Sequence, residues 1–454
     1  MARRLFVTLL SLLALFALVA AKRRSVRSPG IDAPLRPERS FAITDAGVLA
    51  PFRFERVLAQ LAARADVPGL TAEKLFRQWM DTQNPKPGLD AAMPHCDDEL
   101  VNGKPSLNGF ARGCPTNEGP RATAPFHPDA FIPIAITNRF DMADGAQCGE
   151  YRIVFADTTV SSVEVFHIIF EGVLPNPRPE LGLAGCRPVA QFWADLSAVE
   201  SRTERRDRLE RFFFDGISGF APVIDPAHYS TAPAGIRTLQ ATLPVQATHF
   251  LQFRLVRECT NGTCRAIMKP DALENAPFGD FLDARVTTPQ AQRFRDAFVA
   301  QVKDLAVRDV NLYFMSIPNE FLLGDTQPTP SDLTFILDRP FSASLVSSEG
   351  LAFKARIDEA LRASGSTLSA QQVVARAETM GCVGCHFLSG DVGEGVRFPP
   401  PLQDQQHVSE KQFTFIGQDK QFAISPAMRD VFIPHRMQIL RDFLVSGKAP
   451  VHSN

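Results

Sequence analysis

The sequence carries almost no net charge, since 48 lysine and arginine residues oppose 50 aspartate and glutamate residues, for a formal charge of −2. A chain that binds nucleic acid through its overall field needs a clear positive excess, so no nucleic-acid partner is expected. The sequence also has no internal repeat, which argues against solenoid and propeller arrays. With 2 Trp and 3 Tyr against 36 Phe, few of its aromatic side chains carry a polar group.

Familiar enzyme signatures are absent as well. The chain contains no G-x-S-x-G, H-E-x-x-H, phosphate-binding Walker or dinucleotide-binding motif. After residue 21, no segment is apolar enough to span a bilayer. With 45% hydrophobic and 22% charged residues, the composition is that of a chain that can bury a large core.

The first 21 residues predict an export signal. A pair of arginines precedes the apolar stretch 5–21, and Val19 and Ala21 are small enough for the positions that a signal peptidase reads. The alternative is an uncleaved anchor, because basic residues 22–24 follow at once. We therefore expect a periplasmic or extracellular protein that keeps no stable transmembrane span once the signal is cleaved.

The cysteines fit an oxidising compartment. There are eight, an even number, at positions 96, 114, 148, 186, 259, 264, 382 and 385. An Asn-Gly turn at 261–262 between two strand-like segments places Cys259 opposite Cys264, at the short separation that suits a disulfide. Cys96–Cys114 and Cys148–Cys186 are the simplest remaining pairs, although spacing leaves other pairings open.

Hydrophobic periodicity predicts an α+β multidomain protein, with a disulfide-containing α+β N-terminal region followed by a small all-α domain. A linker over 22–50 precedes a first unit over 51–130, in which helices near 54–65 and 71–79 lead into an irregular proline- and glycine-rich stretch over 83–130. An α+β domain of unknown role is expected over 131–345. Its predicted strands cover 131–136, 151–155, 163–170, 249–259, 264–269, 312–317 and 333–337, and its helices cover 187–199, 203–214 and 289–307.

The segment 350–454 has a different character. Helical patterns at 351–363, 368–379 and 434–445 surround a middle that is largely loop. Its apolar residues are too few to form an obvious core unaided, which suggests that another group fills it.

The strongest chemical signal is Cys382-Val383-Gly384-Cys385-His386. Two thiols at this spacing can add to the two vinyl groups of a haem, and the histidine that follows projects to the iron as its fifth ligand. The alternatives are a redox-active disulfide or half of a zinc site. However, no second cysteine pair has ordinary zinc-ligand spacing, and the segment lacks the βαβ pattern of a thioredoxin. The motif predicts one covalent haem c, bound through Cys382 and Cys385, with His386 on the iron.

From about residue 364 to the end, the chain resembles a small class I monohaem c-type cytochrome, with the haem motif after one helix, a Gly/Pro-rich middle and a terminal helix. The resemblance implies an all-α fold, an unknown redox partner protein and a methionine as sixth iron ligand before the terminal helix. Met428 occupies that place. His435 is the alternative, and an open sixth site is a further one. Met437 and His407 are interpreted as packing or surface residues. Arg397 is interpreted as a solvated arginine, with pairing to a haem propionate as the alternative.

A second resemblance covers residues 131–200. With Asn138-Arg139-Phe140-Asp141, the stretch 148–152 and Ile169-Phe170-Glu171, it is similar to a recurrent part of uncharacterised exported bacterial proteins, and it implies no activity. His167 shares a strand face with apolar residues and is interpreted as a core histidine. Asp141 and Asp144 suit a turn before Gly145 as well as they suit a cation site.

These patterns predict an exported protein with a c-type cytochrome domain, whose function is haem binding and single-electron transfer. One alternative is a haem-dependent oxidoreductase, peroxidase-like, in which the open sixth site binds a small substrate. Another is a binding or scaffold protein in which the haem is structural. The presence or absence of a protein side chain as sixth ligand distinguishes the first two.

Overall fold

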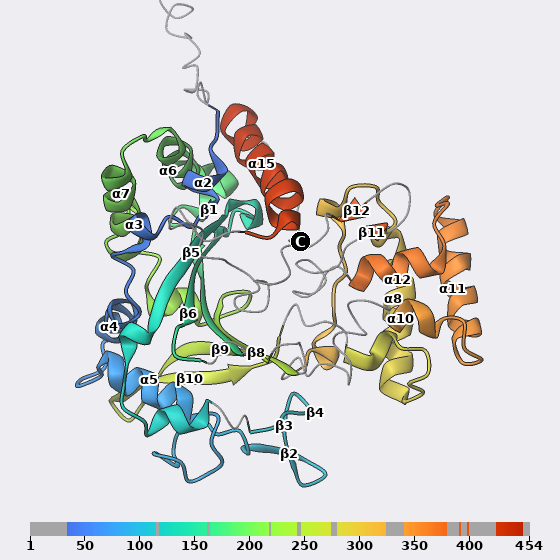
Figure 1. Cartoon of the computed structure of the whole chain (residues 1–454), viewed down its shortest axis with the longest axis horizontal. Coiled ribbons are helices and arrows are strands. Elements are labelled where there is room, and N and C mark those ends of the chain that lie inside the picture. Colours follow the sequence, from blue (N-terminus) through green and yellow to red (C-terminus); the bar gives the residue numbers. More distant parts are fainter. Residues whose placement is uncertain are drawn as a thin grey trace, which may run out of the picture.

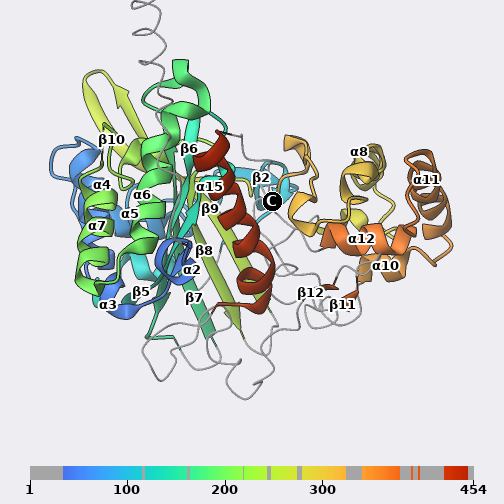
Figure 2. The ribbon, with the colours of Figure 1, turned by 90° about the horizontal axis from the view of Figure 1, so that it is seen from above.

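The computed structural model describes residues 34–114, 118–160, 164–217, 219–242, 247–273, 279–323, 340–378, 390–391, 397–398 and 424–447. Two groups of elements are apparent, a sheet group and a helical group, with helix α15 (Ile433–Ser446) between them (Figures 1 and 2). Among the described residues, no helix is long and apolar enough to cross a membrane.

The sheet group is built on seven antiparallel strands in the order β1-β5-β6-β7-β8-β9-β10. Side chains alternate between the two faces, so that Tyr151, Ile153 and Phe155 of one strand all enter the same apolar core. The predicted α+β class is confirmed. The strands are β1 (Ala42–Ile43), β5 (Phe131–Arg139), β6 (Gln147–Asp157), β7 (Glu164–Pro175), β8 (Gly235–Thr242), β9 (Ala247–Thr260) and β10 (Thr263–Asp271).

Helices cover one face of this sheet (Figure 2). They are α4 (Phe54–Arg64), α5 (Ala72–Asp81), α6 (Arg187–Ala198) and α7 (Arg202–Phe214), with the short α2 (Pro37–Ser40) and α3 (Ala46–Leu49) near the β1 edge. Thr71 caps α5 by accepting a hydrogen bond from the Lys74 amide. Phe54 and Trp79 reach from α4 and α5 into the aromatic core. Each such buried side chain contributes about 1.5–3 kcal/mol, which holds the helices on the sheet.

All three expected disulfides are present, namely Cys96–Cys114, Cys148–Cys186 and Cys259–Cys264. The last pair stands directly opposite in the β9–β10 register, as the Asn-Gly turn predicts. Asn261 and Gly262 have φ angles of 52° and 79°, in the left-handed region that a type I′ turn requires.

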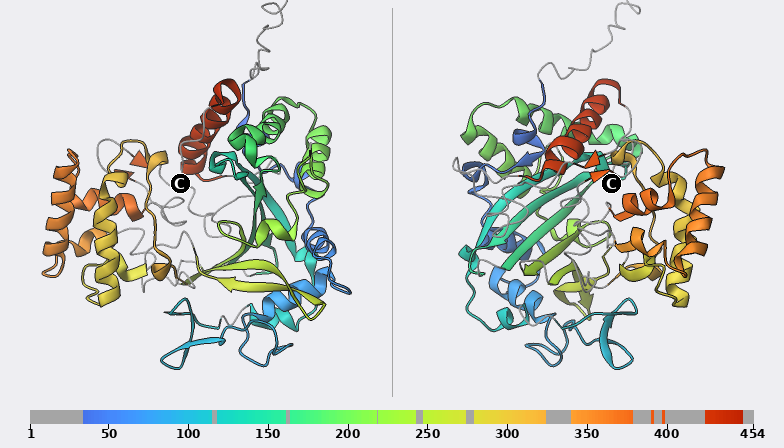
Figure 3. Two further views of the ribbon diagram at one scale, coloured as in Figure 1. Left: turned by 180° about the vertical axis from the view of Figure 1, so that it is seen from behind. Right: turned by 45° about the vertical axis from the view of Figure 1, so that its right-hand side comes forward.

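Residues 83–130 are more regular than predicted. They contain a three-stranded sheet of β2 (Glu99–Val101), β3 (Lys104–Leu107) and β4 (Phe110–Ala111) beyond the β10 edge of the main sheet (Figures 1 and 3). These strands are too short for a hydrophobic period to show. Asn108, between β3 and β4, donates hydrogen bonds of 2.7 Å to the carbonyls of Asn319 and Leu322, and thereby ties this small sheet to the helical group.

The helical group comprises α8 (Pro289–Leu305), α10 (Pro340–Ser344), α11 (Gly350–Ala363) and α12 (Ala370–Glu378). Its apolar core draws on residues 281–377, and so on both sides of the boundary expected near residue 350. The strand predicted at 312–317 is wrong. Tyr313 and Met315 are buried while Phe314 is exposed, so the alternation is real, but the segment lies in no sheet of the described structure. The strand predicted at 333–337 lies outside the described residues.

Helix α15 confirms the predicted terminal helix, but it is preceded by a π-helical turn, η9 (Met428–Phe432), where a loop was expected. Ile433, Leu440 and Phe443 belong to the core of the sheet group, and the ring of Phe443 lies 5.0 Å from that of Phe140. Its apolar stripe therefore packs on the sheet group rather than closing a separate 350–454 unit. The all-α cytochrome domain remains a prediction.

Candidate functional site

The predicted haem-binding residues Cys382, Cys385 and His386 lie outside the described residues, as does His407. Residue 397 is described only as part of β12 (Arg397–Phe398), which pairs with β11 (Gly390–Asp391). Among the described residues, no group of three or more His, Cys, Asp or Glu side chains could hold a metal ion. The described residues that bear on the prediction lie in α12, which precedes the motif in the chain, and in η9 and the start of α15, which hold the two candidate sixth ligands.

Helix α12 ends four residues before Cys382, and its position is firmly fixed. The buried Arg376 donates from Nη1 to the carbonyls of Leu305 and Val307, at 2.9 and 2.6 Å. Its guanidinium also lies over the Tyr313 ring, 5.1 Å from the ring centre. Because a guanidinium in an apolar interior is tolerated only when its donors are satisfied, these contacts tie the end of α12 to the chain that follows α8.

The predicted ligand Met428 lies beside α12. It is half-buried in η9 and packs against a small apolar cluster formed by Ala375, Ala427 and Phe432. Val310 packs against the same cluster. The structure thus places Met428 where the turn before the terminal helix meets α12, and its role as an iron ligand remains a prediction.

The alternative ligand, His435, lies in the first turn of α15, close to the same interface. Its Nδ1 atom is 4.0 Å from Oδ2 of Asp309, the residue before Val310. Its Nε2 atom is buried and has no hydrogen-bond partner among the described residues. A buried imidazole nitrogen without a partner is a site that a metal can occupy. Met428 and His435 are therefore the two side chains at this interface whose atoms could bind a metal.

The other residues that the sequence singles out have structural roles. Met437 packs against the core of the sheet group, and His167 is buried on β7. Asp144 accepts hydrogen bonds from the Ala146 and Gln147 amides, which is the turn that its position suggested. Asp141 pairs with Arg139 and Arg436, so it holds arginines instead of a cation.

The second face of the main sheet carries a buried network of charges that the sequence reasoning did not identify. Oε1 of Glu171 lies 3.2 Å from Nε of Arg152, and its Oε2 lies 2.8 Å from Nε of Arg237. Glu150 also pairs with Arg152. The sequence does carry a sign of this network. Charged residues alternate with apolar ones in β6, and in the structure neither face of that strand is exposed.

The two carboxylates in this network differ in acidity. Burial raises the pKa of Glu150, but the charges of Arg152 and Arg139 outweigh burial and hold that pKa below its ordinary value. Burial raises the pKa of Glu171, which shares Arg152 with its neighbour and has Arg237 as its other partner. Each of the two carboxylates is paired with an arginine of the same network. These pairs link β6, β7 and β8 and favour the observed pairing of these strands.

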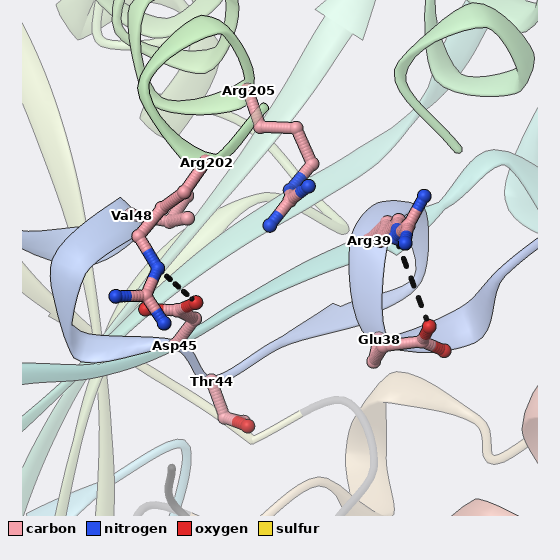
Figure 4. Close-up of a pocket in the computed structure, with 7 residues that line it drawn as sticks. All are labelled: Glu38, Arg39, Thr44, Asp45, Val48, Arg202 and Arg205. Atoms are coloured by element: carbon pink, nitrogen blue, oxygen red, sulfur yellow. Dashed lines mark hydrogen bonds and ion pairs between the residues drawn. The ribbon is translucent and has the colours of Figure 1, made fainter. Parts of the chain in front are cut away.

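A pocket of about 270 Å³ lies between α2, α3 and the start of α7 (Figure 4). Arg205 extends into it between two ion pairs, one of Arg202 with Asp45 and the other of Arg39 with Glu38 (Figure 4). Burial, with Arg39 and Arg202 nearby, lowers the pKa of Arg205. However, Arg205 already donates to two backbone carbonyls, those of residues 199 and 200. The pocket shows no chemistry beyond these internal pairs.

Comparison of the chain with protein-family models, with curated proteins and with solved structures gives no match. The functional argument therefore rests on the residues themselves.

Proposed function

We propose that the protein is an exported c-type cytochrome that carries one covalent haem c and transfers single electrons to or from a redox partner protein. The observation that carries this proposal is the sequence Cys382-Val383-Gly384-Cys385-His386. Each thiol adds its sulfur and its hydrogen across one vinyl double bond, so the attachment needs no oxidant and releases no atom. His386 binds the iron, which supplies the one-electron chemistry when the haem is bound.

Two features of the described residues support this proposal. The three disulfides are typical of proteins in oxidising compartments, where the predicted export signal would send the chain. The interface beside the end of α12 also holds two side chains suited to iron, the thioether of Met428 and the imidazole of His435. We also propose that the C-terminal segment from about residue 364 has the fold of a class I c-type cytochrome, which its sequence resembles.

The test is production of the full chain in a bacterial host that has a haem-maturation system. After denaturation and electrophoresis, the wild-type band is expected to keep its haem stain. Cys382→Ala with Cys385→Ala should lose the stain. The matched control replaces another closely spaced pair of cysteines, Cys259→Ala with Cys264→Ala, and should keep it. A wild-type band without stain, or haem that acidified acetone extracts, would refute covalent attachment.

A further inference from the structure

We propose that the segment 96–114 is a disulfide-closed strap that holds the helical group on the sheet group, and that thiol–disulfide exchange at Cys96–Cys114 releases the helical group. The bond closes a loop that contains the whole small sheet of β2, β3 and β4. All residues of this loop are described by the structure. The proposal concerns this loop alone, so it does not depend on the proposed haem.

The base of the strap belongs to the sheet group. Cys96 is only 2% exposed, and Arg112, two residues before Cys114, is buried as well. Nη2 of Arg112 donates a hydrogen bond of 3.0 Å to Oε1 of Gln83, just beyond the end of α5. The guanidinium also lies 5.9 Å from the centre of the Phe253 ring in β9. The base is therefore anchored both at α5 and on the main sheet.

The tip of the strap reaches the helical group. Asn108, in the β3–β4 turn, donates from Nδ2 to the carbonyls of Asn319 and Leu322, at 2.7 Å each. The Phe110 ring lies 5.6 Å from the ring of Phe281, which belongs to the apolar core of the helical group. The tip thus adds two hydrogen bonds and an aromatic contact between the two groups.

The tip binds a segment, 319–323, that also contacts the main sheet. The carbonyl of Leu323 accepts a hydrogen bond of 2.8 Å from the Leu273 amide. The Leu323 side chain packs against a small apolar cluster that includes Leu239 of β8 and Phe250 of β9. Because the strap and the main sheet hold the same short segment, loss of the strap should weaken the attachment of the helical group there.

The small sheet has little to stabilise it apart from the bond that closes it. Ser106 is the only buried residue in its three strands. The carboxylate of Glu99 organises the β3–β4 turn, since it accepts hydrogen bonds from the amides of Asn108 and Gly109, at 3.1 and 2.7 Å. Short strands without an apolar face are marginally stable on their own. The disulfide is therefore what keeps the tip in position.

The three disulfides differ in how easily a reductant can reach them. Cys148 and Cys186 are fully buried. Cys114, at the end of the strap, is half-buried, and Cys259 is exposed in the β9–β10 hairpin. Attack by a thiolate requires access to a sulfur atom. The Cys96–Cys114 bond is thus both open to attack and connected to both groups of elements.

The exchange step needs a dithiol as reductant. One thiolate of the dithiol attacks Sγ of Cys114, the S–S bond breaks, and Cys96 leaves as a thiolate that takes up a proton. The second thiol of the reductant then attacks the mixed disulfide. Both cysteines end as thiols, and the dithiol ends as a disulfide.

The first experiment measures hydrogen exchange of the full chain by mass spectrometry. In Cys96→Ser with Cys114→Ser, the amides of segment 319–323 should exchange at least roughly tenfold faster than in the wild type, because the two hydrogen bonds from the tip are lost. The matched control, Cys259→Ser with Cys264→Ser, should keep wild-type rates there, because its hairpin lies beside the end of α4. Wild-type rates in the first variant would overturn the proposal.

A second pair of variants tests the tip without touching the disulfide. Asn108→Asp removes both donors, and should accelerate exchange in segment 319–323. Asn102→Asp is the matched control, because Asn102 is exposed in the β2–β3 turn at the opposite end of β3 and has nearly the same φ, 53° against 54°. Equal rates for the two variants would overturn the role of the tip. This comparison decides the matter if circular dichroism shows that the cysteine variant has failed to fold.

The exchange step is tested by titrating the folded wild type with dithiothreitol and trapping free thiols by alkylation. Cys96 and Cys114 should be alkylated before Cys148 and Cys186, and exchange in segment 319–323 should rise at the same dithiothreitol concentration. The serine variant of the strap should show no further rise. Opening of the strap only together with the buried Cys148–Cys186 bond would show that it requires global unfolding, and would overturn the exchange step.

Discussion

At the residue scale, the sequence is most informative where chemistry depends on neighbours in the chain. The spacing of Cys382 and Cys385 and the turn between Cys259 and Cys264 are both local, and the second is confirmed by the structure. The environment of His435 is not local. It depends on Asp309, which reaches the ring only because the helical group lies beside α15 (Figure 3). No periodicity in the sequence reports such a contact.

His228 provides a prediction at this scale. It is buried, its Nδ1 lies 3.3 Å from the Val223 carbonyl, and burial lowers its pKa below the ordinary 6.5, with Arg64 acting in the same direction and Asp225 opposing them. The unfolded chain therefore binds a proton that the folded protein does not. The free energy of unfolding should be highest above pH 6.5 and fall as the pH decreases below that value.

The substitution His228→Asn retains a side-chain donor but does not titrate. Urea unfolding between pH 5 and 7.5 should give a flatter dependence on pH for this variant than for the wild type. Equal slopes for the two proteins would show that His228 does not contribute to the acid sensitivity of the fold.

At the scale of elements, the periodicity predicts most helices and strands of the sheet group, because each has an apolar face that enters the core. It fails for β2–β4, which are too short to show a period, and for 312–317, where alternate burial occurs without a partner strand. The resemblance also places Met428 in a loop, whereas the structure has it in the π-helical turn η9, with Pro426 in the first helical turn, where proline is well tolerated. In each case the secondary structure that the segment adopts depends on the elements it packs against, which a local sequence pattern does not show.

The docking of α15 on the sheet group yields a second prediction. Asp141, in the 3-10 turn that follows β5, accepts hydrogen bonds from Arg139 and lies 3.7 Å from Nε of Arg436 in α15. All three side chains are buried. Asp141→Ala would leave two buried arginines without this carboxylate, and should destabilise the protein by about 3–5 kcal/mol.

The matched control is Asp144→Ala. Asp144 is exposed and its side chain accepts hydrogen bonds from the Ala146 and Gln147 amides of its own turn, so its loss should cost about 0.5–1.5 kcal/mol. Urea unfolding measures both values. Similar small losses for the two variants would contradict the importance of the Asp141 pairs for the docking of α15.

The β9–β10 hairpin gives a third prediction. The Cys259–Cys264 bond joins Cα atoms 4.0 Å apart across a short loop. On the loop-closure model it contributes at most about 2–3 kcal/mol, and it also prevents the strands from slipping in register. Peptide mapping without reduction should recover the two cysteines in one linked fragment. A free thiol at either position, or a link to any of the other four bridged cysteines, would refute the pairing.

At the scale of the whole molecule, the α+β class and the disulfide framework could be predicted from the sequence, but the grouping of the elements could not. The helical group takes part of its core from α8, and the terminal helix packs on the sheet group. Both arrangements depend on which apolar faces fit one another, and a helical stripe on its own does not specify its partner. Only the structure shows that Ala375 of α12 packs with Phe432 of η9, the turn that leads into α15.

The central claim, that the chain carries one covalent haem c, is tested most directly by the intact mass of the denatured, purified protein. Wild type produced with a haem-maturation system should exceed the mass of its disulfide-bonded, processed polypeptide by one haem group. The mass excess should be absent from the variant that combines Cys382→Ala and Cys385→Ala. A wild-type mass equal to that of the polypeptide alone, in a host that matures a control cytochrome, would contradict the account.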